Sequence, residues 1–530
     1  MHSSIKYVIM GEEEAKERFF MDKIVKRIII FVFTVFVVLT LLIFVLSDSF
    51  SASKLLIIAA IAAVIVLYAK FPVISEWKIN RTRPLLLAAA ASSLFLRIVW
   101  VYFVKAIPVS DFYTYHSLAG ALVNGEILYP KFISLFPHVF GYSKVLSVVY
   151  SIFGPRPDSA VAFNIALNIG ILLLIYLIGK ILHDEKTGLV SAVIYAFWPS
   201  QIFYNSLVLT EPFFTFGLLF LIAVYLYAVK HINNIIRRFA VFLFIGITAG
   251  FLNYIRPAVV ILVISLLIHY LLMEYKYNLR DKDGKTELLI RAGICVLMIV
   301  SYTAVSSFVS GRIGNRIGIE VAKKPSGFYI LAGLNIESEG RWSEKDSVFL
   351  ESLISEGLTS DQIHEQLAET GLKRLKEMDL FSFIKLQVNK NKHMWGNDHK
   401  SITYIQNSVS PASRVNISKH AVWLTFAADA YYFLFLALSF AALFFVKNND
   451  KEKINSGSYV FYLYILGTVA AHMLAEVHSR YHYPVIPLLC LVAGVFFSKL
   501  NMTGFLERNK QKGTVLASPE EKQEQSSSFR

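Results

Sequence analysis

Asp111 stands just beyond an apolar run that is long enough to cross a membrane. The run covers 84–105, and a helix that rises about 1.5 Å per residue crosses a ~30 Å hydrocarbon core in this length. The stretch Pro108-Val-Ser-Asp-Phe-Tyr-Thr-Tyr-His116 therefore places an acid at a membrane surface. Ser110 and Asp111 could cap an interfacial helix there, or the carboxylate could take part in chemistry.

Three further clusters place charges where apolar runs begin or end. They are Thr210-Glu211-Pro212, Arg256 before Pro257, and the stretch Glu476-Val-His-Ser-Arg-Tyr-His-Tyr-Pro484. Taken singly, the acid suits a helix start, the arginines could reach lipid headgroups, and the tyrosines could be interfacial anchors. Taken together, two acids and two arginines at one leaflet indicate a site for an anionic lipid.

Transfer from a lipid phosphate is the chemistry that needs such a set. An arginine binds phosphate through two hydrogen bonds and stabilises it as it leaves, and a carboxylate opposite can deprotonate an acceptor hydroxyl. Asp111 is the expected catalytic base. The candidate donor-phosphate ligands are Arg256, Arg480 and Lys144, and the candidate substrate-binding residues are Tyr115, His116, Glu211, His478 and Tyr481.

Composition places the chain among polytopic membrane proteins. Its 530 residues are 55% hydrophobic and 17% charged, and the mean hydropathy is +0.54. The net charge of +14 comes from basic residues in short links between apolar runs, which is typical of cytoplasmic loops and does not indicate nucleic acid. Cys295 and Cys490 both lie in apolar runs, so neither a disulfide framework nor a cysteine metal cluster is expected.

The apolar runs predict an all-α bundle of about 12–13 hydrophobic helices with a small extracytoplasmic segment. The first run is longer than the hydrophobic region of a usual signal peptide, and a second apolar run follows almost at once, so we expect a retained anchor. The runs lie near 28–46, 54–71, 84–105, 138–154, 160–182, 187–204, 207–229, 238–254, 256–273, 288–310, 421–446, 457–476 and 481–499.

Basic links predict the orientation. The links at 70–83, 230–238, 274–291 and 447–453 are rich in Lys and Arg and should be cytoplasmic, which places Asp111 outside. For 311–420 to lie outside as well, one run must fail to span. The best candidate is 138–154, which is short and carries polar residues, so we expect a re-entrant or interfacial helix there.

The polar segment 311–420 is expected to form a lid or an acceptor platform. Residues 342–380 indicate two short amphipathic helices, with Thr359-Ser-Asp-Gln362 near a helix start. The tail after 511 has a disordered composition. We expect five divisions of the chain. They are an N-terminal segment with two extra spans (1–83), a membrane core that includes the outer loop 106–137 (84–310), the outer segment (311–420), the C-terminal spans (421–500) and a cytoplasmic tail (501–530).

The order of these motifs resembles the polyprenol-phosphate-sugar-dependent transferases of GT-C type, which include protein O-mannosyltransferases and the lipid A aminoarabinose transferase. The likeness covers roughly 84–310 and 457–499. It is carried by the acid in the first outer loop, Tyr129-Pro130, Gly141-Tyr-Ser143, Phe153-Gly154, Phe197-Trp-Pro199 with Ser206, Thr210-Glu-Pro-Phe-Phe-Thr-Phe216, Tyr254-Ile-Arg-Pro257 and Arg480-Tyr-His-Tyr-Pro484.

The resemblance implies a plasma-membrane enzyme whose active site faces outside. It implies Asp111 as the catalytic acid, an undecaprenyl-phosphate-like sugar donor, an outer cavity and an inverting displacement onto a protein, lipid or polymer acceptor. Many members carry a second acid beside the first, whereas Ser110 and Phe112 flank Asp111 here. We therefore expect no two-acid metal site, although a divalent cation is left open.

Two other functions remain open at this point. A ligase that acts on a lipid diphosphate would also use outer arginines, and it would require His478 or His482 instead of Asp111. A transporter or lipid flippase would place charges at the membrane midplane, whereas the charged clusters of this sequence lie at one face.

Overall fold

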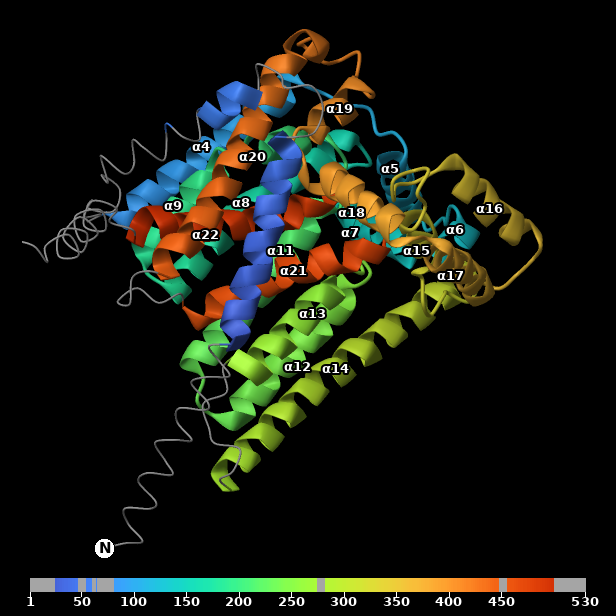
Figure 1. Cartoon of the computed structure of the whole chain (residues 1–530). Coiled ribbons are helices and arrows are strands. Elements are labelled where there is room, and N and C mark those ends of the chain that lie inside the picture. Colours follow the sequence, from blue (N-terminus) through green and yellow to red (C-terminus); the bar gives the residue numbers. More distant parts are fainter. Residues whose placement is uncertain are drawn as a thin grey trace, which may run out of the picture.

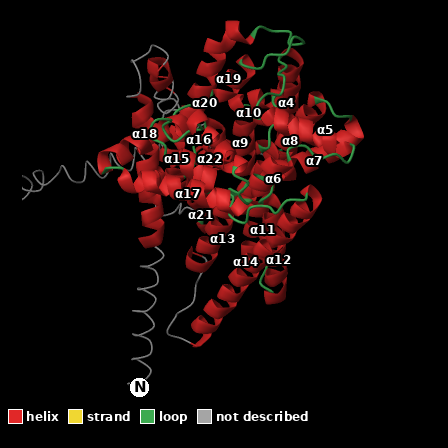
Figure 2. Ribbon diagram, turned by 90° about the vertical axis from the view of Figure 1, so that its right-hand side faces the viewer, coloured by secondary structure: helices red, strands yellow, loops and turns green. Residues whose placement is uncertain are grey.

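A computed structural model describes residues 24–45, 54–59, 63, 81–273, 282–447 and 455–499, and within them the chain is helical with no β-strand (Figure 2). One isolated bridge joins Ala106 to Val409. The basic N-terminus up to residue 23, most of the run expected at 54–71 and the tail from 500 lie outside the described residues.

Nine helices in the described part of the chain are long and apolar enough to cross a membrane, so the expected all-α membrane fold is confirmed. Figure 1 shows the first of them, in dark blue, standing along the bundle. They are Ile24–Val45, α4 (Thr82–Phe103), α8 (Pro157–Leu182), α11 (Glu211–His231), α12 (Ile235–Leu252), α14 (Lys282–Ile317), α20 (Ile417–Lys447), α21 (Tyr459–Leu474) and α22 (Ile486–Lys499), of which the last follows the 3₁₀ segment η4 (Ser479–Val485). A shorter apolar pair, α13 (Val259–Ile268) and the π-helical η2 (His269–Met273), follows α12.

The run predicted at 187–204 is not one helix but is broken into α9 (Glu185–Ala196), α10 (Pro199–Phe203) and η1 (Tyr204–Ser206). Lys230 at the end of α11 donates to the Ile181 carbonyl at the end of α8, so α8 and α11 run in the same direction. The broken segment between them must therefore return the chain to the other end of the bundle. The break is buried inside protein, with Trp198 and Leu209 fully covered. Irregular backbone at membrane depth is tolerated only in such a setting.

The run predicted at 138–154 forms α7 (Pro137–Phe153), which lies across one end of the bundle. Near its start, Gly141 lies against the backbone of Tyr254. At its other end, the Ser159 hydroxyl at the start of α8 donates to the Phe153 carbonyl over 3.2 Å. Both ends of α7 are thus at the same end of the bundle, as the expected interfacial helix requires, and α5 (Asp111–Val123) packs along it.

The segment 311–420 adds five shorter helices on this end of the bundle, and α14 reaches from the opposite end to them (Figure 1). They are α15 (Gly327–Gly333), α16 (Glu344–Ser355), α17 (Ser360–Glu377), α18 (Leu380–Trp395) and α19 (Lys400–Gln406), beside α6 (Pro130–Leu135) of the first loop. The two amphipathic helices expected in 342–380 are confirmed as α16 and α17. A capping box formed by Thr359 and Gln362 begins α17.

The contact between α7 and the 254–257 turn leads to the first prediction. A methyl group on Gly141 would lie 1.8 Å from the Tyr254 carbonyl oxygen, so the backbone that carries Arg256 must move. Gly141→Ala is expected to lose about 1–3 kcal/mol of stability from overpacking, and to lower activity if Arg256 binds substrate. Thermal unfolding of the purified protein measures the change.

Gly311→Ala is the matched control. This glycine is inside helix α14 and an added methyl group meets nothing within 4 Å. Alanine should stabilise the helix there by about 0.5–1 kcal/mol. Equal effects of the two substitutions would contradict the close contact of α7 with the turn.

Candidate active site

Four charged side chains from distant parts of the chain meet at the end of the bundle covered by α7. Arg480 Nη2 forms an ion pair with Asp111 Oδ2, and its Nε lies 3.6 Å from Glu211 Oε1. Arg256 Nη1 lies 2.5 Å from the same Glu211 oxygen. The structure therefore joins the four charges into one alternating chain, Asp111, Arg480, Glu211 and Arg256.

Each of the four residues is at an end of a helical element, which explains why they share one face. Asp111 is the first residue of α5, and Glu211 is the first residue of α11, followed by Pro212. Arg256 lies in the turn between α12 and α13, and Arg480 lies in η4. The Ser110 side chain makes no capping hydrogen bond, and its φ of 51° turns the chain sharply into α5.

Burial separates the four residues into a covered part and an accessible part. The side chains of Glu211, Arg480 and Arg256 are 2%, 11% and 17% exposed, whereas that of Asp111 is 49% exposed. Both arginines are thus directed into the protein toward carboxylates, and the interpretation that they merely reach lipid headgroups is wrong. Asp111 is the member of the chain that an incoming substrate can reach.

Electrostatics keep the Asp111 carboxylate ionised. Burial would raise its pKa, but the Arg480 guanidinium beside it holds the pKa below its usual range. For Arg256, burial would lower the pKa, and Glu211 raises it instead. All four groups are therefore charged at neutral pH, and the cluster is balanced, with two positive and two negative charges.

Aromatic rings line the charged cluster. Arg256 lies over the Tyr481 ring at 5.1 Å, and Arg480 lies over the Phe112 ring at 5.4 Å. Tyr115 is one turn after Asp111 on α5 and packs edge to face on Tyr142 of α7. Burial raises the pKa of Tyr115, so its hydroxyl remains a neutral donor. Tyr115 and Tyr481, both named from the sequence, are thus beside the charged groups.

His478 lies next to the arginine and is held in place by Tyr404 of α19. The two rings stack with centroids 5.6 Å apart, and the Tyr404 hydroxyl is 2.8 Å from His478 Nδ1. Burial, followed by the positive charge of Arg480, lowers the pKa of His478 to about 3. The imidazole is therefore neutral at physiological pH.

Two candidates from the sequence lie apart from the charged chain. His116 is turned toward α7, where its Nδ1 is 2.6 Å from the Tyr150 hydroxyl. Lys144 is on the exposed side of α7, one helical turn beyond Gly141. Neither makes a described contact with the two arginines, so the geometry favours Arg256 and Arg480 as phosphate ligands over Lys144.

Two ionisable residues near the cluster received no role from the sequence. His138 is on α7, and its pKa is lowered to about 4 by burial and then by Arg256. Glu476 is four residues before Arg480, and its backbone N–H donates to the Tyr329 carbonyl over 2.8 Å. Glu476 belongs to the charged stretch 476–484 that the sequence places at the same leaflet as Asp111, but only the fold shows that both residues are buried beside the charged cluster.

His482 belongs to a separate buried network. Its Nε2 lies 2.9 Å from Asp398 Oδ1, and its Nδ1 donates to the Met394 carbonyl over 2.6 Å. Asp398 also accepts from Trp198 and Ser200, at 2.7 and 2.6 Å. His482 is 2% exposed, so it is a structural residue that joins the outer segment to the bundle. A ligase mechanism that relies on His482 does not fit this position.

No group of three or more His, Cys, Asp or Glu side chains that could hold a metal ion occurs among the residues that the structure describes. The carboxylates of Asp111 and Glu211 are instead engaged by arginines.

Glu476 leads to the second prediction. Burial raises its pKa from the ordinary 4.5 to about 7, although Arg480 opposes the shift. The folded protein therefore holds this proton more tightly than the unfolded chain. The stability that results is fully present below pH 4.5 and is lost as the pH rises through 7. The free energy of unfolding should fall by about 3 kcal/mol at most on this account between pH 4.5 and 8.

Glu476→Gln should remove this pH dependence, because an amide does not titrate. Thermal unfolding of both proteins between pH 4.5 and 8 measures the difference, with Glu351→Gln on the exposed side of α16 as a control that should keep the wild-type slope. Identical slopes for wild type and Glu476→Gln would contradict the shifted carboxyl.

Comparison with known proteins supports the resemblance seen in the sequence. Residues 137–304 match the family described as dolichyl-phosphate-mannose-protein mannosyltransferase. This range contains α7, Glu211 and Arg256, but neither Asp111 nor Arg480. No curated protein sequence matches the chain.

Similar solved structures include the oligosaccharyltransferase of Archaeoglobus fulgidus in its apo form, with 14% identity, 82% of this chain covered and a TM-score of 0.42. The chain spans about half of that protein, 52% of its length. Another is ArnT from Cupriavidus metallidurans bound to undecaprenyl phosphate, with 10% identity, 78% and 77% of the two chains covered and a TM-score of 0.31. The family match supports a glycosyltransferase, and the chain is an all-α polytopic membrane protein that resembles the polyprenol-phosphate-dependent transferases of GT-C type.

Proposed function

We propose that this protein transfers a sugar from a polyprenyl phosphate to an acceptor on the outer side of the plasma membrane, with inversion at the anomeric carbon. The observation that carries the proposal is the Asp111–Arg480–Glu211–Arg256 chain, in which one accessible carboxylate stands beside two covered guanidinium groups. The match of residues 137–304 to a family of lipid-phosphate-sugar transferases supports the same chemistry.

In the proposed reaction, Asp111 accepts the proton of an acceptor hydroxyl as its oxygen attacks the anomeric carbon. The bond from that carbon to the phosphate oxygen breaks on the opposite face, and the lipid phosphate leaves with both electrons of this bond. Arg256 and Arg480 stabilise the charge that develops on the leaving group. One proton moves to Asp111 and a glycosidic bond to the acceptor oxygen replaces the glycosyl phosphate bond of the donor, so the step balances without any further reactant.

Arg480 gives the site a way to activate its base on substrate binding. In the free protein this guanidinium pairs with Asp111 and keeps the pKa of the carboxyl low, which makes Asp111 a weak base. A donor phosphate competes for the same guanidinium. As Arg480 turns toward the phosphate, Asp111 loses its counterion, its proton affinity rises, and it becomes a better base when the donor is in place.

The charge distribution supports an outward-facing site. Lys230 and Arg238 lie at the ends of α11 and α12 that are farthest from the site, and Arg291 donates to the Tyr270 carbonyl at that same end of the bundle. Basic residues favour the cytoplasmic side, so the opposite end, which carries Asp111, faces outside.

A transfer assay with the full chain in lipid vesicles tests the function. Radiolabelled polyprenyl-phosphate sugars are supplied together with a cell-envelope extract as acceptor. Transferred label is counted both in the product that is insoluble in organic solvent and in lipid products separated from the donor by chromatography. The proposal expects label transfer from the monophosphate donors. Transfer only from lipid diphosphates, or none from any donor of a panel that includes hexoses and aminoarabinose, would overturn it.

A lipid-diphosphate ligase is the second candidate, because the neutral His478 beside Arg480 could act as its base. This reading expects His478→Phe to abolish transfer and Asp111→Asn to leave it unchanged. The sugar-transfer proposal expects the opposite order of effects, so the two variants distinguish the functions in one assay.

A further inference from the structure

Helix α18 of the outer segment exposes a stripe of large apolar side chains. Leu380, Phe381, Ile384 and Val388 are 74%, 77%, 51% and 44% exposed, and their spacing places them on one face of the helix. The opposite face is filled, with Leu386, Lys390 and Met394 buried in the protein. The stripe is therefore a second apolar face that no other described part of the chain covers.

The same face of α18 continues directly onto a membrane-spanning helix. Three and seven residues after Val388, Asn391 and Trp395 contact the Ile24–Val45 helix. Asn391 Nδ2 is 3.3 Å from the Thr40 hydroxyl, and the Trp395 ring packs edge to face on Phe36 at 5.0 Å. The stripe on α18 is thus continuous with the surface of a span that itself exposes Phe31, Val35, Leu39 and Leu42.

These contacts lie well inside the apolar run of the span. Thr40 and Phe36 lie seven and eleven residues before Ser47, the first residue of the polar stretch that follows the apolar run in the sequence. At about 1.5 Å per residue, they are roughly 10 and 16 Å from the point where the apolar sequence ends. The C-terminal half of α18 therefore packs on an apolar part of this span, and the stripe at 380–388 extends from that contact.

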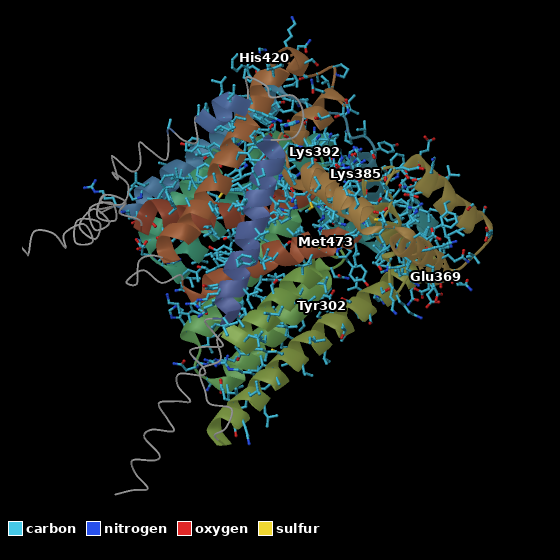
Figure 3. The ribbon with its side chains drawn as sticks, in the orientation of Figure 1. Tyr302, Glu369, Lys385, Lys392, His420 and Met473 are labelled. Atoms are coloured by element: carbon cyan, nitrogen blue, oxygen red, sulfur yellow. The ribbon has the colours of Figure 1, made fainter. Side chains whose placement is uncertain are left out.

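The charge of this part of the chain fits a lipid surface. Residues 380–420 contain six Lys and Arg but a single acid, Asp398, which is buried against His482. Lys385 and Lys392 are on α18 itself, beside the stripe, and Figure 3 labels both of them on this helix. The Gln387 side chain donates to the Met473 carbonyl over 3.2 Å, which ties α18 to this span as well.

We propose that α18 is seated in the outer leaflet of the bilayer, with Leu380, Phe381, Ile384 and Val388 in the acyl region and Lys385 and Lys392 at anionic headgroups. Apolar residues with flanking lysines are the pattern by which amphipathic helices lie in an interface. The outer segment is then part of the membrane surface of the protein and not a purely aqueous lid. This inference does not depend on the proposed transfer reaction.

Spin labelling tests the inference on the full chain. Single cysteines at Phe381, Ile384 and Val388 are labelled with a nitroxide in vesicles that contain phosphatidylglycerol, and collisions with oxygen are compared with those of a water-soluble nickel chelate. Val348 on α16, which is 57% exposed, is the control position. The native Cys295 and Cys490 are buried, at 4% and 0% exposed, so the spin label should react with them very little.

The inference expects high oxygen and low nickel collision rates at the three α18 positions, and the reverse at position 348. Nickel collision rates equal to those at position 348 would overturn it, because the stripe would then face water. Protection from both reagents would also overturn it, because another protein segment would then cover the stripe. In vesicles of phosphatidylcholine alone, the three labels should collide less with oxygen and more with nickel, because they lie less deep. The double variant Lys385→Gln, Lys392→Gln should give the same collision rates with and without phosphatidylglycerol.

Discussion

Asp111→Asn is expected to lower sugar transfer by about 100-fold to 10,000-fold, the range that positioned general bases contribute. The amide has the shape of the carboxylate but cannot accept the proton of the acceptor hydroxyl. The substitution should leave the fold intact, since the Asp111 side chain is 49% exposed and Arg480 keeps Glu211 as a counterion at 3.6 Å. Initial rates in the vesicle assay, at matched protein levels, measure the loss.

Asp158→Asn is the matched control for this prediction. Asp158 is another acid near the end of the bundle that carries the site, it also pairs with a basic residue, Lys105 at 3.1 Å, and its side chain is 68% exposed. It is at the start of α8, away from both arginines of the site. Its substitution should leave the rate within about twofold, since exposed ion pairs contribute little. If both variants lost activity equally, a general loss of surface charge would explain the result, and Asp111 would have no special role.

The four charged residues of the site could be predicted from the sequence because each interrupts an apolar pattern at the end of a run. Polar residues at such positions are conspicuous, and the positive-inside bias assigns them to one side of the membrane. The pairing could not be predicted in the same way. Asp111 and Arg480 are separated by 369 positions, and only the fold, in which the start of α5 meets η4, brings them into contact.

Residues whose role depends on burial were missed. Lys390 looks like an ordinary surface lysine of α18, yet it is 3% exposed and donates to the carbonyls of Gly333 and Met473 at 2.8 and 3.1 Å. Arg97 is inside α4, fully buried, and lies over the Tyr195 ring at 5.6 Å. Arg97 is therefore an exception to the expectation that charges lie at one face of the membrane. Mean hydropathy does not show it, because the residues on both sides of Arg97 are apolar.

Hydropathy also fails to predict where a helix breaks and which short helices lie at the membrane surface. The apolar content of 187–204 predicts a span, but Pro199 cannot continue the helix, and the break is stable only because polar side chains such as Ser206, which donates to the Val104 carbonyl at 2.8 Å, complete its hydrogen bonds. The sequence predicts a lid or an acceptor platform at 311–420, which contains α18, and the apolar stripe of this helix does not stand out there. Contacts of α18 with the first span, far away in sequence, are the basis for the proposal that this helix lies in the outer leaflet.

Glu211→Gln is expected to lower the free energy of unfolding by about 3–5 kcal/mol, the usual cost of removing one partner from a buried ion pair. Glu211 is 2% exposed and faces Arg256 at 2.5 Å and Arg480 at 3.6 Å, so its neutralisation leaves two covered guanidinium groups with only Asp111 between them. Thermal unfolding of the solubilised protein, followed by tryptophan fluorescence, measures the change.

Two further variants separate this effect from a general loss of hydrogen bonding. Glu185→Gln removes the acid of an exposed pair, with Lys180 at 2.6 Å, and should leave the unfolding midpoint unchanged. The double variant Glu211→Gln, Arg256→Gln removes one charge of each sign, so it should unfold at a higher temperature than Glu211→Gln alone. If Glu211→Gln unfolded like the wild type, Glu211 would not be the counterion of the two arginines. Since transfer from a lipid phosphate requires both arginines to be held covered and charged until the donor arrives, the proposed phosphate clamp would then lose its physical basis.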